Sequence, residues 1–295
     1  MQRLGAFSAR HSPRPSGMLT AESLPLRYVA HLSLTGASHT TVSANLAGIR
    51  HLHVAKGLSW QGRTERIKLA LRAVAKTPRR PRTARLPISV PLLLRLRRRL
   101  RRGGLPTTDH RAVWAAATLG FFGALRGNEY LAPGKATFSR RRTCLKKHVS
   151  ITTDRLTLHI PASKTDQTGR GADVALPRLE GPACPVRAMR LYLSATSHLP
   201  RDLPLFTFDS GDYATIPWLN RILRRYLPSP TGTFSTHSLR IGFATAAAAA
   251  GATDDAIRAS GRWQGSSYAR YIRGPRLDVW HACLAVNAAY RRQCR

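Results

Sequence analysis

The sequence predicts a mainly α-helical protein with a small antiparallel β-sheet, divided into an N-terminal helical domain and a larger α+β domain. Apolar residues recur at intervals of three and four through most of the chain, which is typical of amphipathic helices. Over residues 148–176 the interval changes to two, as in strands with one buried face. A proline- and arginine-rich run separates the two parts, because closely spaced prolines remove backbone donors and hold the chain extended.

The N-terminal helical domain is expected over residues 23–76. Its apolar positions predict three helices with a basic face, over residues 24–32, 41–55 and 64–75. Gly57 is expected to end the second helix. Residues 1–22 are interpreted as a disordered leader. A targeting peptide is the alternative, because the segment holds arginines and serines and no acid before Glu22.

The larger domain is expected over residues 87–295, after a basic linker of residues 77–86. Helical spacing predicts helices over residues 92–100, 111–125, 186–193, 218–226, 236–250, 253–259 and 277–290. Thr108 and Asp109 are the expected N-terminal caps of the helix at 111–125. Alternating apolar residues predict three strands, around Ile151, from Leu156 to Ile160, and from Val174 to Leu176.

The charge of the chain points to a polyanionic partner. Lys and Arg number 48 against 14 Asp and Glu, which gives a formal net charge of +34 and a pI near 11.7. Each Lys or Arg that neutralises a phosphate releases counterions, so a polyanion is the expected partner. A solvated basic face is the simpler alternative. A membrane is not expected, because the longest mainly apolar stretch, residues 112–125, is shorter than the roughly 18 residues that span a bilayer.

No cofactor, metal or small-molecule substrate is predicted. The four cysteines, Cys144, Cys184, Cys283 and Cys294, form no CxxC pair, so neither a zinc site nor a disulfide framework is indicated. A reducing, intracellular location fits this pattern. The sequence has no Walker loop and no cluster of acids that would hold two magnesium ions.

Candidate chemistry gathers around His237 and Arg240. They are three residues apart, so they share one face of a helix that begins near Thr236, whose free N–H groups favour anions. Elsewhere, Arg126 follows an apolar helix and Lys164 lies at the turn between two strands. Each of these two also has a structural explanation, Arg126 as a helix C-terminal cap and Lys164 as a solvated turn residue.

Five strings resemble the motifs of the tyrosine recombinase family, the phage-integrase-like enzymes that exchange DNA strands. They are Gly123-Ala-Leu-Arg126-Gly-Asn-Glu129, Ser163-Lys164-Thr165, His237-Ser-Leu-Arg240, Gly261-Arg-Trp263 and Tyr271-Ile-Arg273. The resemblance covers nearly the whole chain and implies a helical core-binding domain followed by a catalytic domain. The hairpin string and Gly261-Arg-Trp263 are most similar to recombinase domains of eukaryotic mobile elements of the DIRS kind.

The resemblance implies a role for each site residue. Arg126 and Arg240 would clamp the charge that builds on the phosphate oxygens, since guanidinium groups bind such oxygens bidentately. His237 would hydrogen-bond a nonbridging oxygen, and so would the indole N–H of Trp263, which stands where many relatives have a second histidine. Glu129 would support the arginine and histidine without taking part in the chemistry.

Two further residues would carry the covalent step. Lys164 would give a proton to the departing 5′ oxygen, and Tyr271 would attack the phosphorus and form a 3′-phosphotyrosine. Tyr268 competes for the nucleophile role. Tyr271 is preferred because Ile272-Arg273 matches the family string, although the Trp263 to Tyr271 spacing is one residue shorter than the family often shows.

The expected partners follow from the same resemblance. The protein would bind double-stranded DNA and act as a homo-oligomer, a tetramer on two DNA sites. Residues 277–290 would form a helix that docks on a neighbouring protomer, and packing on its own domain is the alternative. Nuclear location is expected in a eukaryote and cytoplasmic location otherwise. Three other functions stay open: a type IB topoisomerase, a catalytically silent DNA-binding derivative, and an RNA-binding protein.

Overall fold

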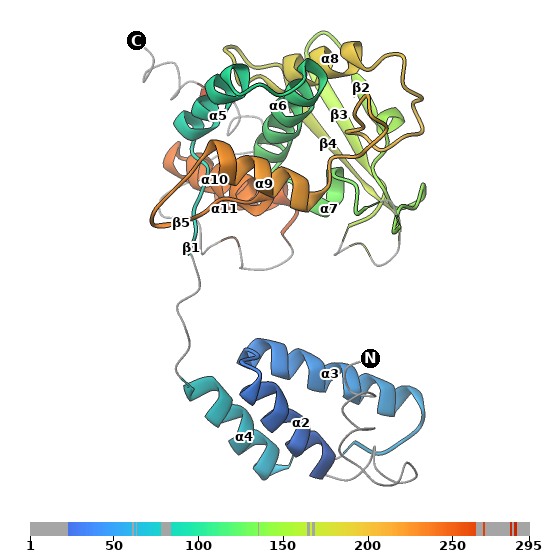
Figure 1. Ribbon diagram of the computed structural model, residues 1–295, viewed down its shortest axis with the longest axis vertical. Helices are drawn as coiled ribbons and strands as arrows, with labels where there is room; N and C mark the ends of the chain where they lie inside the picture. The colour runs from blue at the N-terminus through green and yellow to red at the C-terminus, as the bar shows by residue number, and fades with distance from the viewer. Residues whose placement is uncertain are drawn as a thin grey trace. The chain divides into compact units, whose positions relative to one another are not determined.

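The computed structural model describes residues 23–60, 62, 64–77, 84–134, 136–163, 166, 169–263, 268, 284, 286 and 287. The chain divides into two compact units, Met1–Arg82 and Thr83–Arg295 (Figure 1). The leader expected over residues 1–22 lies outside the described residues.

The first unit consists of three helices, α2 (Ser23–Leu34), α3 (His39–Ala55) and α4 (Glu65–Lys76). Ser38 and Thr64 begin α3 and α4 by accepting backbone N–H groups of the first turn, as N-cap residues do. The core between the helices is apolar, and Val42 and Ile67 are fully buried in it. The three predicted helices of this unit are confirmed, each to within two residues at either end.

The second unit combines a sheet with a larger group of helices. The helices are α5 (Val90–Arg102), α6 (Thr107–Phe122), α7 (Gly127–Tyr130), α8 (Pro185–Ala195), α9 (Ile216–Tyr226), α10 (Thr236–Ala249) and α11 (Asp254–Gly261). Strands β2 (Val149–Ile151), β3 (Arg155–Ile160) and β4 (Ala172–Pro177) form an antiparallel sheet in the order β2-β3-β4. Leu158 pairs with Val149 on one side and Val174 on the other. The predicted fold class is therefore confirmed.

Helix α6 is the centre of this unit. Every residue from Ala112 to Phe122 is buried, and the helix packs against α8 on one side and α10 on another (Figure 1). Small side chains make this possible, because Ala115, Ala116 and Ala117 let neighbouring helices approach closely. The long apolar stretch of the sequence is thus a core helix. Among the described residues, no helix is both long and apolar enough to cross a membrane.

Three features differ from the sequence-based expectation. Thr108 and Asp109 do not cap α6: the N-cap is Pro106, and the Thr108 hydroxyl donates to Asp209 at 2.7 Å instead. The short helix α7 was too brief to produce an apolar period. A parallel pair, β1 (Ala84–Arg85) with β5 (Gly232–Thr233), joins segments far apart in the chain, which no local pattern can indicate.

The expected helix at 277–290 lies mostly outside the described residues. Of the three positions described there, Val286 is buried and Leu284 is exposed. Cys144 and Cys184 are buried and free, and the other two cysteines lie outside the described residues.

Candidate active site

The N-termini of α7 and α10 lie side by side. A Cβ atom placed on Gly127, the first residue of α7, would be 3.1 Å from the Thr236 hydroxyl at the start of α10. The Asn220 side chain accepts the Thr236 N–H at 2.7 Å and so completes the beginning of α10. Since Arg126 immediately precedes α7, this contact brings Arg126 to the end of α10 that carries His237 and Arg240.

Glu129 ties Arg126 to the start of α7. Its carboxylate accepts the Arg126 backbone N–H at 2.8 Å and the Arg126 Nη1 at 2.8 Å. The Glu129 side chain is 1% exposed, whereas Arg126 keeps 25% of its side chain exposed. Arg126 is therefore fixed in direction while part of its guanidinium faces solvent. Glu129 is thus both an acid in the first turn of α7 and the hydrogen-bond partner of the Arg126 side chain.

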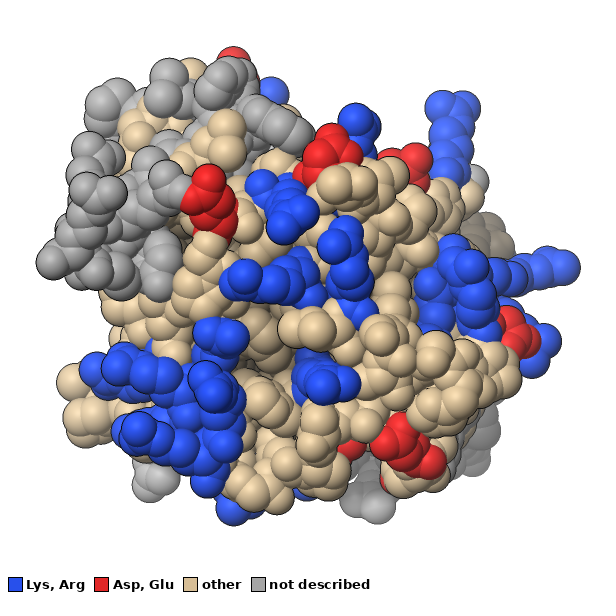
Figure 2. Space-filling model, turned by 90° about the horizontal axis from the view of Figure 1, so that it is seen from above, with Lys and Arg blue, Asp and Glu red and all other residues tan. Residues whose placement is uncertain are grey.

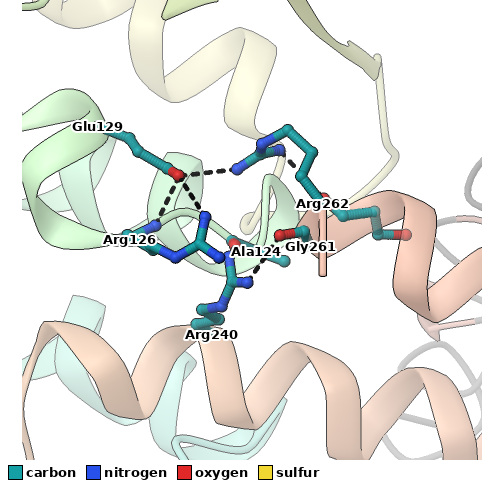
Figure 3. Close-up of polar contacts among 7 residues, drawn as sticks. Ala124, Arg126, Glu129, Arg240, Gly261 and Arg262 are labelled. Carbon is teal, nitrogen blue, oxygen red and sulfur yellow. Dashed lines mark hydrogen bonds and ion pairs between the residues drawn. The ribbon is translucent and has the colours of Figure 1, made fainter. Parts of the chain in front are cut away.

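A third arginine, Arg262, shares the same carboxylate. Its Nη2 donates to Glu129 Oε2 at 2.7 Å, and its Nη1 donates to the Ser260 carbonyl at 3.1 Å (Figure 3). Sequence reasoning missed this residue, although it stands inside the Gly261-Arg-Trp263 string. Its place directly before Trp263 puts it near the predicted site, but no pattern in the sequence indicates Glu129 as its partner.

Arg240 is buried at the centre of the cluster. Only 2% of it is exposed, and its guanidinium joins two loops. Nη1 donates to the Ala124 carbonyl in a short hydrogen bond, and Nη2 donates to the Gly261 carbonyl at 2.6 Å (Figure 3). Arg240 thus connects the turn before Arg126 to the end of α11. Burying a cation is costly unless it is well hydrogen-bonded, which explains why its partners are oriented carbonyl groups.

The two loops that hold Arg240 are strained. Among the described residues, Ala124 (φ 44°) and Arg262 (φ 51°) are the two non-glycine residues with positive φ. A side chain in this left-handed region costs on the order of 1–3 kcal/mol, and such strain gathers at functional sites. Ala124 supplies a carbonyl to Arg240, and Arg262 directly follows the residue that supplies the other.

Trp263 closes the cluster on the side of α11. Its ring lies against the Arg240 guanidinium, and it is 9% exposed. Gly261 is required beneath it, since a Cβ there would come within 1.9 Å of the ring. Tyr268 is buried as well, with its ring centroid 6.2 Å from that of Trp263. Tyr268 is therefore packed in the core of the second unit.

His237 is half-buried on the first turn of α10. Burial lowers its pKa from the ordinary value of 6.5, and the positive charges of Arg85, Arg240 and Arg126 lower it further. A neutral imidazole has one N–H to donate and one nitrogen that accepts. At neutral pH His237 can therefore donate a hydrogen bond to a phosphate oxygen without adding charge to the cluster.

The other two candidate residues, Lys164 and Tyr271, lie outside the described residues. For Lys164, the residues that precede it in the chain are described and indicate where the hairpin lies. Ser163 and Ala162, at the end of the β3 hairpin arm, line a cavity of about 380 Å³ together with Asn128 and Leu131 at α7. The hairpin arm therefore runs beside the helix that Arg126 begins.

The surface of the second unit carries several groups of Lys and Arg with few acids among them. Figure 2 shows this on the face that is uppermost in Figure 1. Helix α5 contributes three basic residues to its last turn, Arg99, Arg101 and Arg102. Such groups are suited to phosphate contacts.

Comparisons with known proteins place the fold. No protein-family model matches the chain, and neither does any curated protein. Solved structures do match. A Tn1549 transposon integrase in complex with circular intermediate DNA aligns with a TM-score of 0.57 and 15% identity, over 99% of this chain and 92% of that one. A XerH site-specific recombinase bound to a palindromic difH substrate gives 0.56 and 14%, over 92% and 72%.

A lambda integrase (residues 75–356) dimer bound to a COC′ core site gives a TM-score of 0.54 at 13% identity, over 92% of this chain and 86% of that one. At these identities the likeness concerns the fold. The chain has the two-part fold of the tyrosine recombinases.

Proposed function

We propose that this protein is a site-specific DNA recombinase, which cleaves and rejoins strands through a 3′-phosphotyrosine intermediate. Its reaction would support the integration or recombination of a mobile element. The observation that carries the proposal is the cluster of Arg126, Arg240 and His237 at two adjoining helix N-termini. Two guanidinium groups, those of Arg126 and Arg262, share the Glu129 carboxylate, and Arg240 bonds to the carbonyls of Ala124 and Gly261 beside them. The excess positive charge suits a phosphodiester, and the compared integrases and recombinase are described in complex with DNA.

In this mechanism Arg126 and His237, whose side chains are partly exposed, contact the phosphate. Arg240 is 2% exposed and bonded to two carbonyls, so it holds the neighbouring segments and adds positive charge, where the resemblance implied a bidentate clamp. Phosphoryl transfer spreads negative charge over the nonbridging oxygens, and donors that are already oriented stabilise that charge without reorganisation. Glu129 and the two loop carbonyls supply the orientation for Arg126 and Arg240. His237 and the indole N–H of Trp263 would each donate one further hydrogen bond.

Tyr271 and Lys164 would carry the covalent step. The Tyr271 oxygen bonds to phosphorus as the bond to the 5′ oxygen breaks, and Lys164 gives that oxygen its proton. The reverse attack by a 5′ hydroxyl rejoins a strand and releases tyrosine. Because one ester replaces another, the exchange needs no ATP. The positive charges of the arginines and Lys164 would take the place of a metal ion at the phosphate. Tyr268 is a poorer nucleophile candidate, since it is 7% exposed beneath Trp263.

The finer assignment is a recombinase of the DIRS kind that acts as a tetramer on two DNA sites, in the nucleus of a eukaryotic host. It rests on the similarity of Ser163-Lys164-Thr165 and Gly261-Arg-Trp263 to that group. A relaxing enzyme of the type IB kind would use the same groups and act as a monomer. Joining of two DNA sites by the purified protein would favour recombination, and relaxation of supercoils without such joining would favour the other function.

The decisive experiment is a search for a covalent complex. The purified chain is incubated with nicked duplexes made from the DNA that flanks its own gene, and protein joined to a 3′ phosphate is isolated. The wild-type protein and Tyr268→Phe should both form the adduct, whereas Tyr271→Phe should not. An adduct in Tyr271→Phe would move the nucleophile to another residue. If the wild-type protein binds these duplexes and forms no adduct on any of them, the protein is a silent DNA-binding derivative.

A further inference from the structure

Arg262 stands at a backbone position that glycine would occupy at lower cost. Its φ of 51° lies in the left-handed region, where nine of the described glycines also lie and where Ala124 is the one other non-glycine residue described. The backbone at the end of α11 therefore gives no reason for an arginine. The reason has to be sought in what the side chain contacts.

The side chain reaches across to a different element. Residue 262 follows α11, and its guanidinium donates to the carboxylate of Glu129 on α7 at 2.7 Å. That carboxylate is 1% exposed, while the Arg262 side chain keeps 21% of its area exposed. The buried end of the ion pair is thus Glu129, and both arginines that flank it reach the surface (Figure 3).

The charges of this group explain what Arg262 adds. Arg126 and Glu129 alone would form a neutral pair, and a carboxylate beside a phosphate would repel it. A second guanidinium on the same carboxylate leaves the group with one net positive charge. It donates to Oε2, the oxygen that also accepts the Arg126 backbone N–H, while Oε1 accepts the Arg126 Nη1.

We propose that Arg262 is a positioning residue of the phosphate-binding site. It binds the Glu129 carboxylate that also holds Arg126, so the group of three side chains keeps one net positive charge for the substrate phosphodiester. This inference rests on the proposed function, because it assumes that Arg126 binds a DNA phosphate. It adds a third arginine to the site, one whose effect on the substrate is exerted through Glu129 and Arg126.

The test compares charge-removing and charge-keeping variants. Arg262→Gln removes the charge, Arg262→Lys keeps it, and Arg262→Gly also relieves the backbone. Arg258→Gln is the matched control, since Arg258 lies on α11, which Arg262 directly follows, is 51% exposed and faces Asp255 at 3.6 Å. DNA affinity is measured over a series of salt concentrations with a nicked duplex from the flanks of the gene, and adduct formation is followed in single turnover.

We expect Arg262→Gln and Arg262→Gly to reduce the slope of log affinity against log salt by about one, and to slow adduct formation about tenfold or more. Arg262→Lys should restore the slope, and Arg258→Gln should match the wild type in adduct rate. If Arg262 served the fold alone, the salt slope and the adduct rate would not depend on whether the side chain at position 262 is charged. Equal slopes and rates in Arg262→Gln and Arg258→Gln would overturn the proposal, as would loss of folded structure in Arg262→Gly.

The affinity measurement requires no cleavage. A wild-type protein that binds the duplex without forming an adduct would therefore count against the proposed recombinase function, while the salt slopes of the Arg262 variants would still decide whether this arginine supports phosphate binding.

Discussion

The guanidinium carbon of Arg240 lies 4.0 Å from the centroid of the Trp263 ring. Both side chains are nearly excluded from water, at 2% and 9% exposure. An aromatic face attracts a desolvated cation by roughly 2 kcal/mol or more, so the ring replaces water beside the charge. The carbonyls of Ala124 and Gly261 fix the guanidinium in its plane. Together these contacts hold the Arg240 guanidinium in one orientation.

The first prediction concerns this stacking. Trp263→Ala should lower the free energy of unfolding of the second unit by about 3–5 kcal/mol, because it removes a buried ring and leaves Arg240 without its aromatic neighbour. Trp263→Phe should lose less than half as much, since phenylalanine keeps a ring face under the cation. Urea denaturation measures both. Equal losses in the two variants would contradict the prediction, because they would show that a phenyl ring at position 263 restores neither the apolar burial nor the stacking on Arg240.

The second prediction concerns Gly261. An added methyl group would lie 1.9 Å from the Trp263 ring, so Gly261→Ala must displace the ring or the end of α11. Overpacking of this kind costs about 1–3 kcal/mol, and the displaced ring should change the tryptophan fluorescence of the folded protein. Gly48→Ala is the control, because a methyl group there meets nothing within 4 Å in the middle of α3. Alanine should stabilise that helix by about 0.5–1 kcal/mol. A Gly261→Ala protein with unchanged stability and fluorescence would contradict the packing described.

The third prediction concerns Glu129. Glu129→Gln keeps the size of the side chain and removes the charge that two arginines share, so the second unit should lose about 2–4 kcal/mol of stability. Adduct formation should slow as well, because Arg126 is no longer held. Glu65→Gln makes the same chemical change at an exposed pair with Lys68 on α4 and should leave thermal unfolding unchanged. Equal behaviour of the two variants would mean that Glu129 does not organise the site.

Much of the fold could be predicted because its helices and strands carry strong periodic patterns. Leu93, Leu96 and Leu100 mark the buried face of α5, and Leu156, Leu158 and Ile160 mark that of β3. Local patterns failed where structure depends on distant partners. The β1–β5 pair joins Ala84 to Gly232, and α7 exists because Arg126 and Glu129 bond to each other across one turn.

The site could be predicted in part for the same reason. Arg126, Glu129, His237, Arg240 and Trp263 stand in recognisable strings, and the structure gathers them at one place. The role of Arg262 could not be read in this way, since its partner is 133 residues away in sequence. The burial of Arg240 could not be predicted either, because an HxxR string gives no indication that the arginine will donate hydrogen bonds to the carbonyls of Ala124 and Gly261.

The last prediction concerns pH. Burial lowers the pKa of His237, and the charges of Arg85, Arg240 and Arg126 lower it further. On acidification the unfolded chain therefore binds a proton at this residue near pH 6.5, whereas the folded protein binds it only at a lower pH. The contribution of His237 to stability is therefore complete above pH 6.5 and is lost as the pH falls towards the lower pKa of the folded state. His110 and His148, whose pKa values are also lowered chiefly by burial, act in the same direction.

Urea denaturation of the second unit between about pH 5 and pH 8 measures this effect, in the range where histidine titrates. We expect the unfolding free energy of the wild-type protein to fall on acidification, and that of His237→Asn to fall less steeply, because one of the three contributing histidines is gone. His51→Asn replaces an exposed histidine of the first unit and should leave the profile of the second unit unchanged. A His237→Asn profile parallel to that of the wild type would show that His237 is as readily protonated in the folded protein as in the unfolded chain, and that it does not enter the phosphate site as a neutral donor.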